Sequence, residues 1–170
     1  QLERRGRLDT DRETYFRIVE GKTAALFRWA MLAGGRAGGL DGGAALEAFG
    51  VHLGMAFQLV DDVLDYDGEA ARTGKIPFAD LREGKATYPI IVACERDEGV
   101  RGLLAAVVAG ESDPDRALLE RIRATGAFDT TRALALDHAD RAMHALDGFS
   151  DGRAKDALLT LARATVLRDA

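Results

Sequence analysis

The sequence has little of what cross-links a chain or interrupts a helix. It contains one cysteine and three prolines in 170 residues. A single thiol excludes an intramolecular disulfide framework and suits a reducing cytoplasm. The scarcity of proline, together with abundant alanine, leucine and arginine, favours helices, because these side chains lose little freedom on a helix surface. The thiol, Cys94, follows three apolar residues, so we expect it in the core as a small hydrophobic side chain.

Positive charge and long apolar runs are scarce as well. The formal net charge of -5 argues against a generic nucleic-acid surface. No apolar run reaches the ~20 residues that cross a bilayer, so we expect no integral membrane segment. Hydrophobic residues still make up 47% of the chain, which is enough to build a core. The chain begins with Gln1 instead of Met, and we expect it to be part of a larger protein.

Apolar residues recur at helical spacing, and no strand-like alternation of useful length is present. Glycine clusters and N-cap residues mark the expected helix ends. The pattern predicts an all-α helical bundle of about six helices, with residues 1–170 forming part of one domain. The first expected helix runs from Asp9–Thr10 to a break at Gly34–Gly35 and Gly38–Gly39. An apolar central helix over 41–66 and a loop over 67–84 follow. Further helices are expected from Lys85 or Thr87, from Ser112 or Asp113 to Gly126, over 128–147, and from Ser150–Asp151.

The last two expected helices each have an apolar face. We expect these faces to point into the bundle. Their residues are Leu134, Leu136, Ala139, Met143 and Leu146 on the first helix, and Leu158, Leu159, Leu161, Ala162 and Val166 on the second.

The central apolar helix is expected to end in three aspartates. Asp61 and Asp65 are four residues apart, so their carboxylates project from one face, and Gln58 joins that face. Asp62 points about 100° away in an ideal helix. Clustered carboxylates repel one another and lose hydration unless a positive charge compensates. Magnesium (Mg2+) prefers such oxygen ligands together with phosphates and water. The residues alone leave two interpretations open, a magnesium site and an acidic helix end paired with arginines.

Lysines flank this acidic motif in the sequence. Lys22 and Thr23 lie on the first expected helix beside apolar residues, and Lys75 and Lys85 lie on either side of the loop segment that follows the motif. Ammonium and hydroxyl groups around a magnesium–carboxylate cluster are what a diphosphate requires. Each lysine alone is a solvated surface charge, whereas the set predicts a diphosphate site. The histidines have no metal-ligand spacing, and we expect structural or surface roles for all three, His52, His138 and His144.

Three stretches resemble the trans-type isoprenyl (polyprenyl) diphosphate synthases in order and spacing. They are YFRIVEGKTAALF over 15–27, FQLVDDVLDY over 57–66 and GKIPFADLREGKATYP over 74–89. The likeness continues more weakly in TGAFDTTRALALDHADRAMHALDGF over 125–149. The resemblance implies that the chain is the C-terminal part of an isoprenoid-synthase-type bundle. The activity it implies is the magnesium-dependent condensation of isopentenyl diphosphate with an allylic diphosphate.

The resemblance also implies roles for individual residues. Asp61, Asp62 and Asp65 correspond to the second aspartate-rich, metal-binding motif of the family, with Asp61 as a direct Mg2+ ligand and Asp65 acting through or beside metal-bound water. The remaining residues would bind substrate. Lys22 and Lys75 would hold the allylic diphosphate, Thr23 and Gln58 would lie near the reacting end, Phe57 would line the cavity, and Lys85 would add a further contact.

The first aspartate-rich motif of the family has no counterpart in these 170 residues. We therefore expect this chain to need an N-terminal half, on the same polypeptide or on a separate one, and to be inactive alone. The resemblance implies a homodimer in the complete enzyme. Two alternatives stay open, a non-catalytic helical subunit that modulates a partner synthase and a terpene cyclase-like lyase with the same magnesium chemistry.

Overall fold

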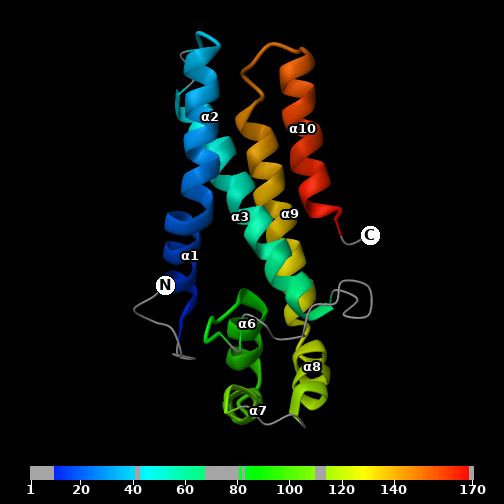
Figure 1. Cartoon of the computed structure of the whole chain (residues 1–170). Coiled ribbons are helices and arrows are strands. Elements are labelled where there is room, and N and C mark those ends of the chain that lie inside the picture. Colours follow the sequence, from blue (N-terminus) through cyan, green and yellow to red (C-terminus); the bar gives the residue numbers. More distant parts are fainter. Residues whose placement is uncertain (1–9, 41–42, 68–80, 82, 110–113, 169–170) are drawn as a thin grey trace. The chain divides into compact units, whose positions relative to one another are not determined.

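A computed structural model of the chain describes residues 10–40, 43–67, 81, 83–109 and 114–168. Within this part of the chain helices follow one another and no strand occurs, so the predicted all-α fold is confirmed (Figure 1). The helices are α1 (Arg12–Val19), a π-helical turn η2 (Glu20–Ala24), α2 (Ala25–Ala37), α3 (Gly43–Asp67), α6 (Tyr88–Arg96), α7 (Gly99–Val108), α8 (Pro114–Ala124), α9 (Ala127–Ala145) and α10 (Arg153–Val166).

The chain forms two compact units. Unit 1 consists of Gln1–Phe16 and Asp61–Arg132, and unit 2 consists of Arg17–Val60 and Ala133–Ala170. The boundaries fall inside α1, α3 and α9. Part of one domain, the organisation expected for residues 1–170, stays a prediction.

Several expected helix ends agree with the structure. Asp11 Oδ1 accepts a hydrogen bond from Thr14 N at 2.8 Å and so caps α1 two residues after the expected start. Helix α6 begins at Tyr88 with Pro89 in its first turn, where a missing N–H costs nothing. Gly126, with φ of +67°, separates α8 from α9, because a side chain is strained in that conformation. The expected loop over 67–84 lies almost wholly outside the described residues.

Other expectations were wrong, and in each case packing outweighs the local signal. The break predicted at Gly34–Gly35 and Gly38–Gly39 is confirmed at the second pair, since α2 ends at Ala37 with Gly38 as its C-cap. Helix α2 continues through the first pair, where Gly35 lies directly against the Leu46 side chain of α3. No helix is predicted where the structure has α7, since Gly99 and Gly102 lower the helix propensity. Its buried face packs against α8 and is formed by Val100, Leu104 and Val107. Leu136 and Leu161, expected inward, are both 49% exposed.

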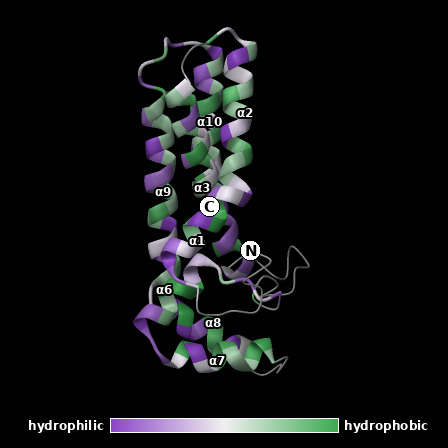
Figure 2. Ribbon diagram, turned by 90° about the vertical axis from the view of Figure 1, so that its left-hand side faces the viewer, coloured by the Kyte–Doolittle hydropathy of each residue, from purple (hydrophilic) through white to green (hydrophobic). Residues whose placement is uncertain are grey.

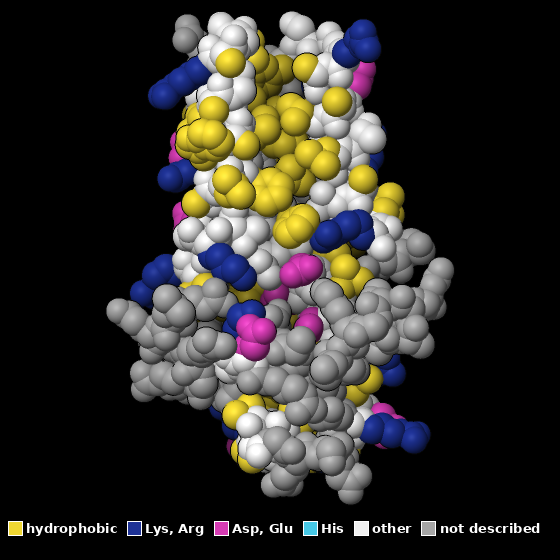
Figure 3. Space-filling model, viewed as in Figure 1, with side chains coloured by type: hydrophobic (Ala, Val, Ile, Leu, Met, Phe, Trp, Pro, Cys, Tyr) yellow, Lys and Arg dark blue, Asp and Glu magenta, His cyan; other side chains and the backbone are white. Residues whose placement is uncertain are grey.

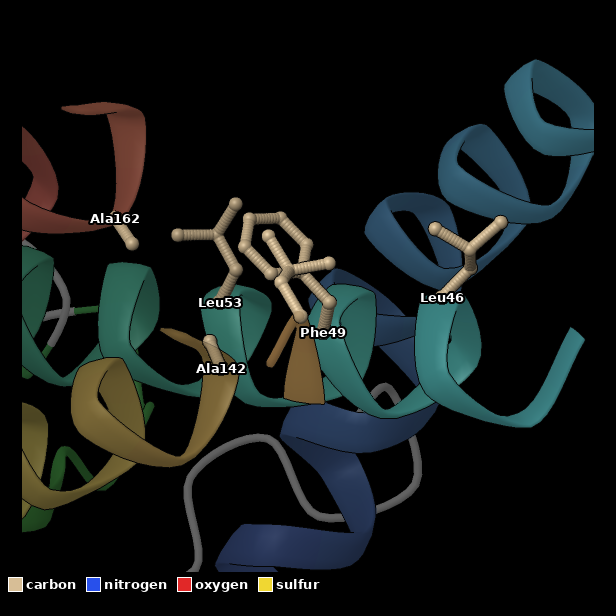
Figure 4. Close-up of a cluster of buried hydrophobic side chains, with 6 residues drawn as sticks. Leu46, Phe49, Leu53, Ala142 and Ala162 are labelled. Atoms are coloured by element: carbon tan, nitrogen blue, oxygen red, sulfur yellow. The ribbon is translucent and has the colours of Figure 1, made fainter. Parts of the chain in front are cut away.

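The core of unit 2 is built around the apolar first part of α3. Leu46, Phe49 and Leu53 project from α3 into the cluster, while small residues of α9 and α10 approach them (Figure 4). Because Ala142 and Ala162 are small, the backbones of these helices come close to the larger side chains of α3. Burial of each large side chain contributes roughly 1.5–3 kcal/mol.

A second contact in unit 2 depends on two glycines of α3. A Cβ atom on Gly50 would lie 2.7 Å from Arg28 Cα, and one on Gly54 would lie 2.6 Å from Ala24 Cα. These distances are shorter than any real contact of a Cβ atom with backbone, so α3 approaches η2 and α2 only because both positions lack a side chain. Gly50 and Gly54 are four residues apart and therefore share one face of the helix.

Unit 1 has its core around α6, which is buried from Tyr88 to Cys94. Cys94 is only 8% exposed, as expected for a core thiol, and burial raises its pKa above the ordinary value. Asp97 lies between α6 and α7 and forms an ion pair with Arg121 of α8. Its Oδ1 also accepts a hydrogen bond at 2.9 Å from Gly99 N, the first residue of α7. One carboxylate therefore connects three helices.

Helix α3 is long and apolar enough, by length and composition alone, to cross a membrane over Gly43–Tyr66. Half of the apolar window is buried inside the protein, as in the core helix of a globular fold. The aspartates of this helix lie in its last two turns, whereas Glu47 near its start pairs with Arg28 at 3.3 Å.

Helix α9 carries both hydrophilic and hydrophobic residues along its length (Figure 2). One exposed ion pair joins Arg141 to Asp137 at 2.9 Å. On another side His138 meets His52 of α3, with 3.0 Å between the two Nδ1 atoms. One ring donates and the other accepts, so a neutral pair satisfies both atoms. Desolvation, followed by the charges of His52 and Arg141, lowers the pKa of His138 to about 4.

We expect Gly54→Ala to destabilise the protein by about 1–3 kcal/mol, because the new methyl group overlaps the backbone of η2. The matched control is Gly34→Ala in α2, where an added Cβ meets no atom within 4 Å. The control should be neutral or stabilising by up to about 1 kcal/mol, since alanine has the higher helix propensity. Chemical denaturation of both variants measures the difference. Equal effects of the two substitutions would contradict the close approach of α3.

The histidine pair predicts a stability that rises with pH. Above the ordinary histidine pKa, neutral His138 makes its full contribution to the free energy of unfolding. As the pH falls from about 6.5 toward 4, the unfolded chain binds a proton that the folded chain does not, and stability is lost. After allowance for its partial exposure, we expect a loss of about 1 kcal/mol. Denaturation at several pH values should give a shallower dependence in His138→Gln than in wild type. The control His144→Gln, at an exposed position of the same helix, should keep the wild-type slope.

Candidate functional site

In unit 2 the predicted residues Lys22 and Thr23 lie in the π-helical turn η2. A single π turn between two α-helices shifts the register of the side chains that follow, and such turns are frequent at functional sites. Lys22 is exposed, whereas Thr23 is partly buried. The turn therefore leaves an ammonium group at the surface and directs the neighbouring hydroxyl into the unit.

The hydroxyl of Thr23 contacts the predicted residue Gln58. Thr23 Oγ1 donates to Gln58 Oε1 at 2.8 Å, although the two residues are 35 positions apart. Gln58 lies one turn after Gly54, so the close approach at Gly54 brings this amide within reach of η2. The hydrogen bond fixes the rotamer of Gln58 and with it the direction in which its amide N–H groups point.

Phe57 is partly buried and has two neighbours in unit 2. Its ring centroid is 5.5 Å from that of Phe27. The guanidinium of Arg168 lies 4.4 Å from the Phe57 centroid and also donates to Phe57 O at 3.4 Å. A cation above an aromatic face is attracted by the ring electrons. Arg168 is not predicted from the sequence, because no local pattern near the C-terminal helix indicates a contact with Phe57, 111 residues away.

Unit 2 also has an open hollow of about 300 Å³ beside η2. It is lined by two arginines, one glutamate and three small or apolar residues: Arg17, Arg28, Glu20, Gly21, Ala25 and Val51. None of the predicted site residues lines this hollow.

In unit 1 the aspartates of α3 have different surroundings. Asp61 and Asp65 are partly buried and lie on successive turns, whereas Asp62 is only 2% exposed. Asp62 Oδ2 accepts hydrogen bonds from Tyr15 OH at 2.7 Å and from Tyr88 N at 2.8 Å. Burial, and after it the negative charge of Asp62, raises the pKa of the Tyr15 phenol well above its ordinary value. Tyr15 is therefore protonated at neutral pH and donates.

One further contact joins the end of α3 to Thr87, and another lies within the segment before α6. Tyr66 OH and Thr87 Oγ1 are 2.5 Å apart, and both side chains are buried. Lys85 is partly buried and pairs with Glu83 at 2.7 Å. The predicted residue Lys75 lies outside the described residues.

The donor chemistry of Asp61 and Asp65 suits a magnesium ion. In the part of the chain that the structure describes, no three residues among His, Cys, Asp and Glu form a group that could hold a metal by themselves. Mg2+ needs no such cage, because it commonly binds one or two carboxylates and completes its shell with phosphate oxygens and water. Two carboxylates one turn apart fit that requirement, and Mg2+ binding by them stays a prediction.

Comparison with known proteins identifies the family. The family model described as polyprenyl synthetase matches residues 1–125. An octaprenyl diphosphate synthase of Escherichia coli is 35% identical over 169 residues, which are 95% of this chain and 51% of that protein. A probable mitochondrial hexaprenyl pyrophosphate synthase of Neurospora crassa is 38% identical over 150 residues, 87% of this chain and 33% of that protein. The chain belongs to the polyprenyl synthetase family.

The solved structures give the same answer for the fold. A polyprenyl synthase from Caulobacter crescentus, complexed with calcium and isoprenyl diphosphate, superposes with a TM-score of 0.89 at 38% identity. The superposition covers 100% of this chain and 54% of that one. The chain thus spans about half the length, or less, of the relatives it matches.

The contact between Thr23 and Gln58 predicts the effect of two substitutions. Thr23→Val keeps the shape of the side chain but removes the donor, and should cost about 1 kcal/mol of stability. Thr23→Ser keeps the hydroxyl and should stay closer to wild type. Chemical denaturation compares the two. If valine were tolerated as well as serine, the hydrogen bond would not contribute to the stability of unit 2.

Proposed function

We propose that the complete protein containing this chain is a polyprenyl diphosphate synthase, which condenses isopentenyl diphosphate with an allylic diphosphate. The family match over residues 1–125 is the observation that carries the proposal. The acidic end of α3 and the Lys22–Thr23 turn support it, because a diphosphate substrate requires both a metal site and cationic contacts. The relatives named above are octaprenyl and hexaprenyl synthases.

Asp61 and Asp65 are the carboxylates proposed to hold Mg2+. When bound, the metal would neutralise the diphosphate and so favour its departure as pyrophosphate. A structure of the Caulobacter crescentus relative, solved with calcium and isoprenyl diphosphate, supports a divalent cation beside this substrate class. Asp62 was predicted as a third ligand and that role stays a prediction, although its Oδ2 already accepts two hydrogen bonds.

The other predicted residues are proposed to bind and orient the substrates. Lys22, Lys75 and Lys85 supply positive charge to the allylic diphosphate. Thr23 and Gln58 form a preoriented polar pair, proposed to lie near the reacting end of the prenyl chain. The Phe57 ring offers an apolar surface that keeps water from that end.

We also propose that an N-terminal half completes the site. The relatives are about twice as long as this chain or longer, and the first acidic motif of the family is absent here. Unit 2 has apolar side chains to offer such a half. Hydrophobic groups gather on the face that Figure 3 presents, over α2 and the helices beside it. Leu26 and Trp29, three residues apart on α2, are 65% and 66% exposed. A homodimer and a cytoplasmic location belong to the same proposal.

The experiment is prenyl transfer by the complete protein, or by this chain reconstituted with its N-terminal half, in the presence of Mg2+. Asp61→Ala should lower turnover by about 100-fold or more, because one side of the metal site is lost. The control is Asp129→Ala, which removes an exposed carboxylate from α9 and changes the net charge equally. The control should keep wild-type turnover.

Two outcomes would overturn parts of the proposal. Unchanged turnover in Asp61→Ala would contradict the proposed role of Asp61 in holding Mg2+. Release of pyrophosphate from the allylic substrate without consumption of isopentenyl diphosphate would identify a lyase instead of a transferase. Both products are therefore measured in the same reaction.

A further inference from the structure

The last turns of α3 present two neighbouring pairs of side chains. Asp61 and Asp65 are four residues apart and partly exposed, whereas Asp62 and Tyr66 are four residues apart and buried. Each residue of the second pair follows one of the first, so the two pairs are about 100° apart around the helix. What holds the buried pair therefore determines where the exposed pair points.

The buried pair contacts the segment that begins α6. Thr87 is the N-cap of this helix, but its side chain makes no capping hydrogen bond. Asp62 Oδ2 accepts the N–H of Tyr88, the first residue of the helix, and thus does from α3 what a local cap normally does. A negative charge at that end is also favoured by the helix dipole. Tyr66 OH meets the Thr87 hydroxyl, so the two contacts are adjacent.

Asp62 has its second partner in α1. Tyr15 OH donates a hydrogen bond to Asp62 Oδ2, and the centroids of the Tyr15 and Tyr88 rings are 5.3 Å apart. The carboxylate therefore joins three elements of unit 1 that are far apart in sequence. If Asp62 turned away to another ligand, the buried Tyr15 hydroxyl and the first N–H of α6 would lose this acceptor, and a buried donor left unsatisfied is costly.

We propose that Asp62 is a positioning residue that anchors the end of α3, and that it is not a third metal ligand. Together with Tyr15, Tyr66, Thr87 and the backbone of Tyr88 it forms a group that we name the Asp62 clasp. The clasp fixes the rotation of the last turns of α3 and so the direction of Asp61 and Asp65. This inference rests on the proposed function, because the role of Asp61 and Asp65 does.

The size of the effect follows from helix geometry. A carboxylate lies roughly 6 Å from the helix axis, so a rotation of about 10° moves it by roughly 1 Å. Misplacement of this size is enough to lower the rate of a positioned reaction substantially. Loss of the clasp should therefore lower kcat more than it weakens substrate binding.

The first experiment compares asparagine at the two positions in the complete protein. Asp62→Asn keeps an oxygen acceptor for Tyr15 and Tyr88, so the Mg2+ concentration for half-maximal turnover should stay within about 3-fold of wild type. Asp61→Asn removes a charged ligand, and the same concentration should rise about 10-fold or more. An equal rise in the two variants would overturn the clasp. No rise in Asp61→Asn would instead overturn the metal site of the proposed function.

The second experiment uses thermal unfolding in a chelator, where metal binding contributes nothing. Asp61→Ala should leave Tm unchanged or raise it, because like charges near Asp65 then repel less. Asp62→Ala and Tyr15→Phe should lower Tm, by about 3–5 °C for the tyrosine variant, because buried hydrogen bonds are lost. A raised Tm in Asp62→Ala would show that Asp62 behaves as one more repelling carboxylate, and would overturn the proposal.

Tyr15→Phe also tests positioning without touching an aspartate. It should lower kcat about 3- to 10-fold while KM for both diphosphates changes less than about 2-fold. The matched control is Tyr88→Phe, which removes a phenol hydroxyl but keeps the N–H that Asp62 accepts. The control should keep wild-type kcat. If Tyr15→Phe retained full kcat, or lost it no more than the control, the clasp would have no positioning role.

Discussion

Helix α3 must bury an apolar surface and hold four aspartates within the same 25 residues. It does so by separating the two tasks along its length. The first turns carry Leu46, Phe49 and Leu53 into the core of unit 2, and the aspartates are confined to the last turns, in unit 1. This arrangement keeps most aspartates of α3 away from its most apolar turns, and the buried Asp62 is compensated by two hydrogen bonds.

Two devices place the functional groups of this helix. In unit 2 the missing side chains of Gly50 and Gly54 bring the backbone of α3 against η2, which leaves Gln58 in reach of Thr23. In unit 1 the carboxylate of Asp62 faces inward and accepts two hydrogen bonds, while Asp61 and Asp65 stay partly exposed. Gly50, Gly54 and Asp62 are not proposed to contact a substrate, but they set the positions of the residues that are.

The structure follows the sequence where the signal is local. Capping, the proline of α6, the glycine between α8 and α9 and the long apolar period of α3 are properties of neighbouring residues, and the structure agrees with them. Local signals fail where packing decides. The glycines at 34 and 35 predict a helix break, but α2 continues through them beside Leu46. Helix α7 forms despite its two glycines, because its apolar face packs on α8.

Residue types and their spacing along the chain are enough to predict the family, the all-α class and the aspartates, lysines and glutamine that carry the proposed chemistry, because none of these depends on tertiary contacts. How neighbouring aspartates differ depends on the tertiary fold. Asp62 finds its partners 47 and 26 residues away, and Gln58 finds Thr23 at a separation of 35. A helical period gives the angle between side chains, but the identity of what lies opposite depends on how distant segments pack.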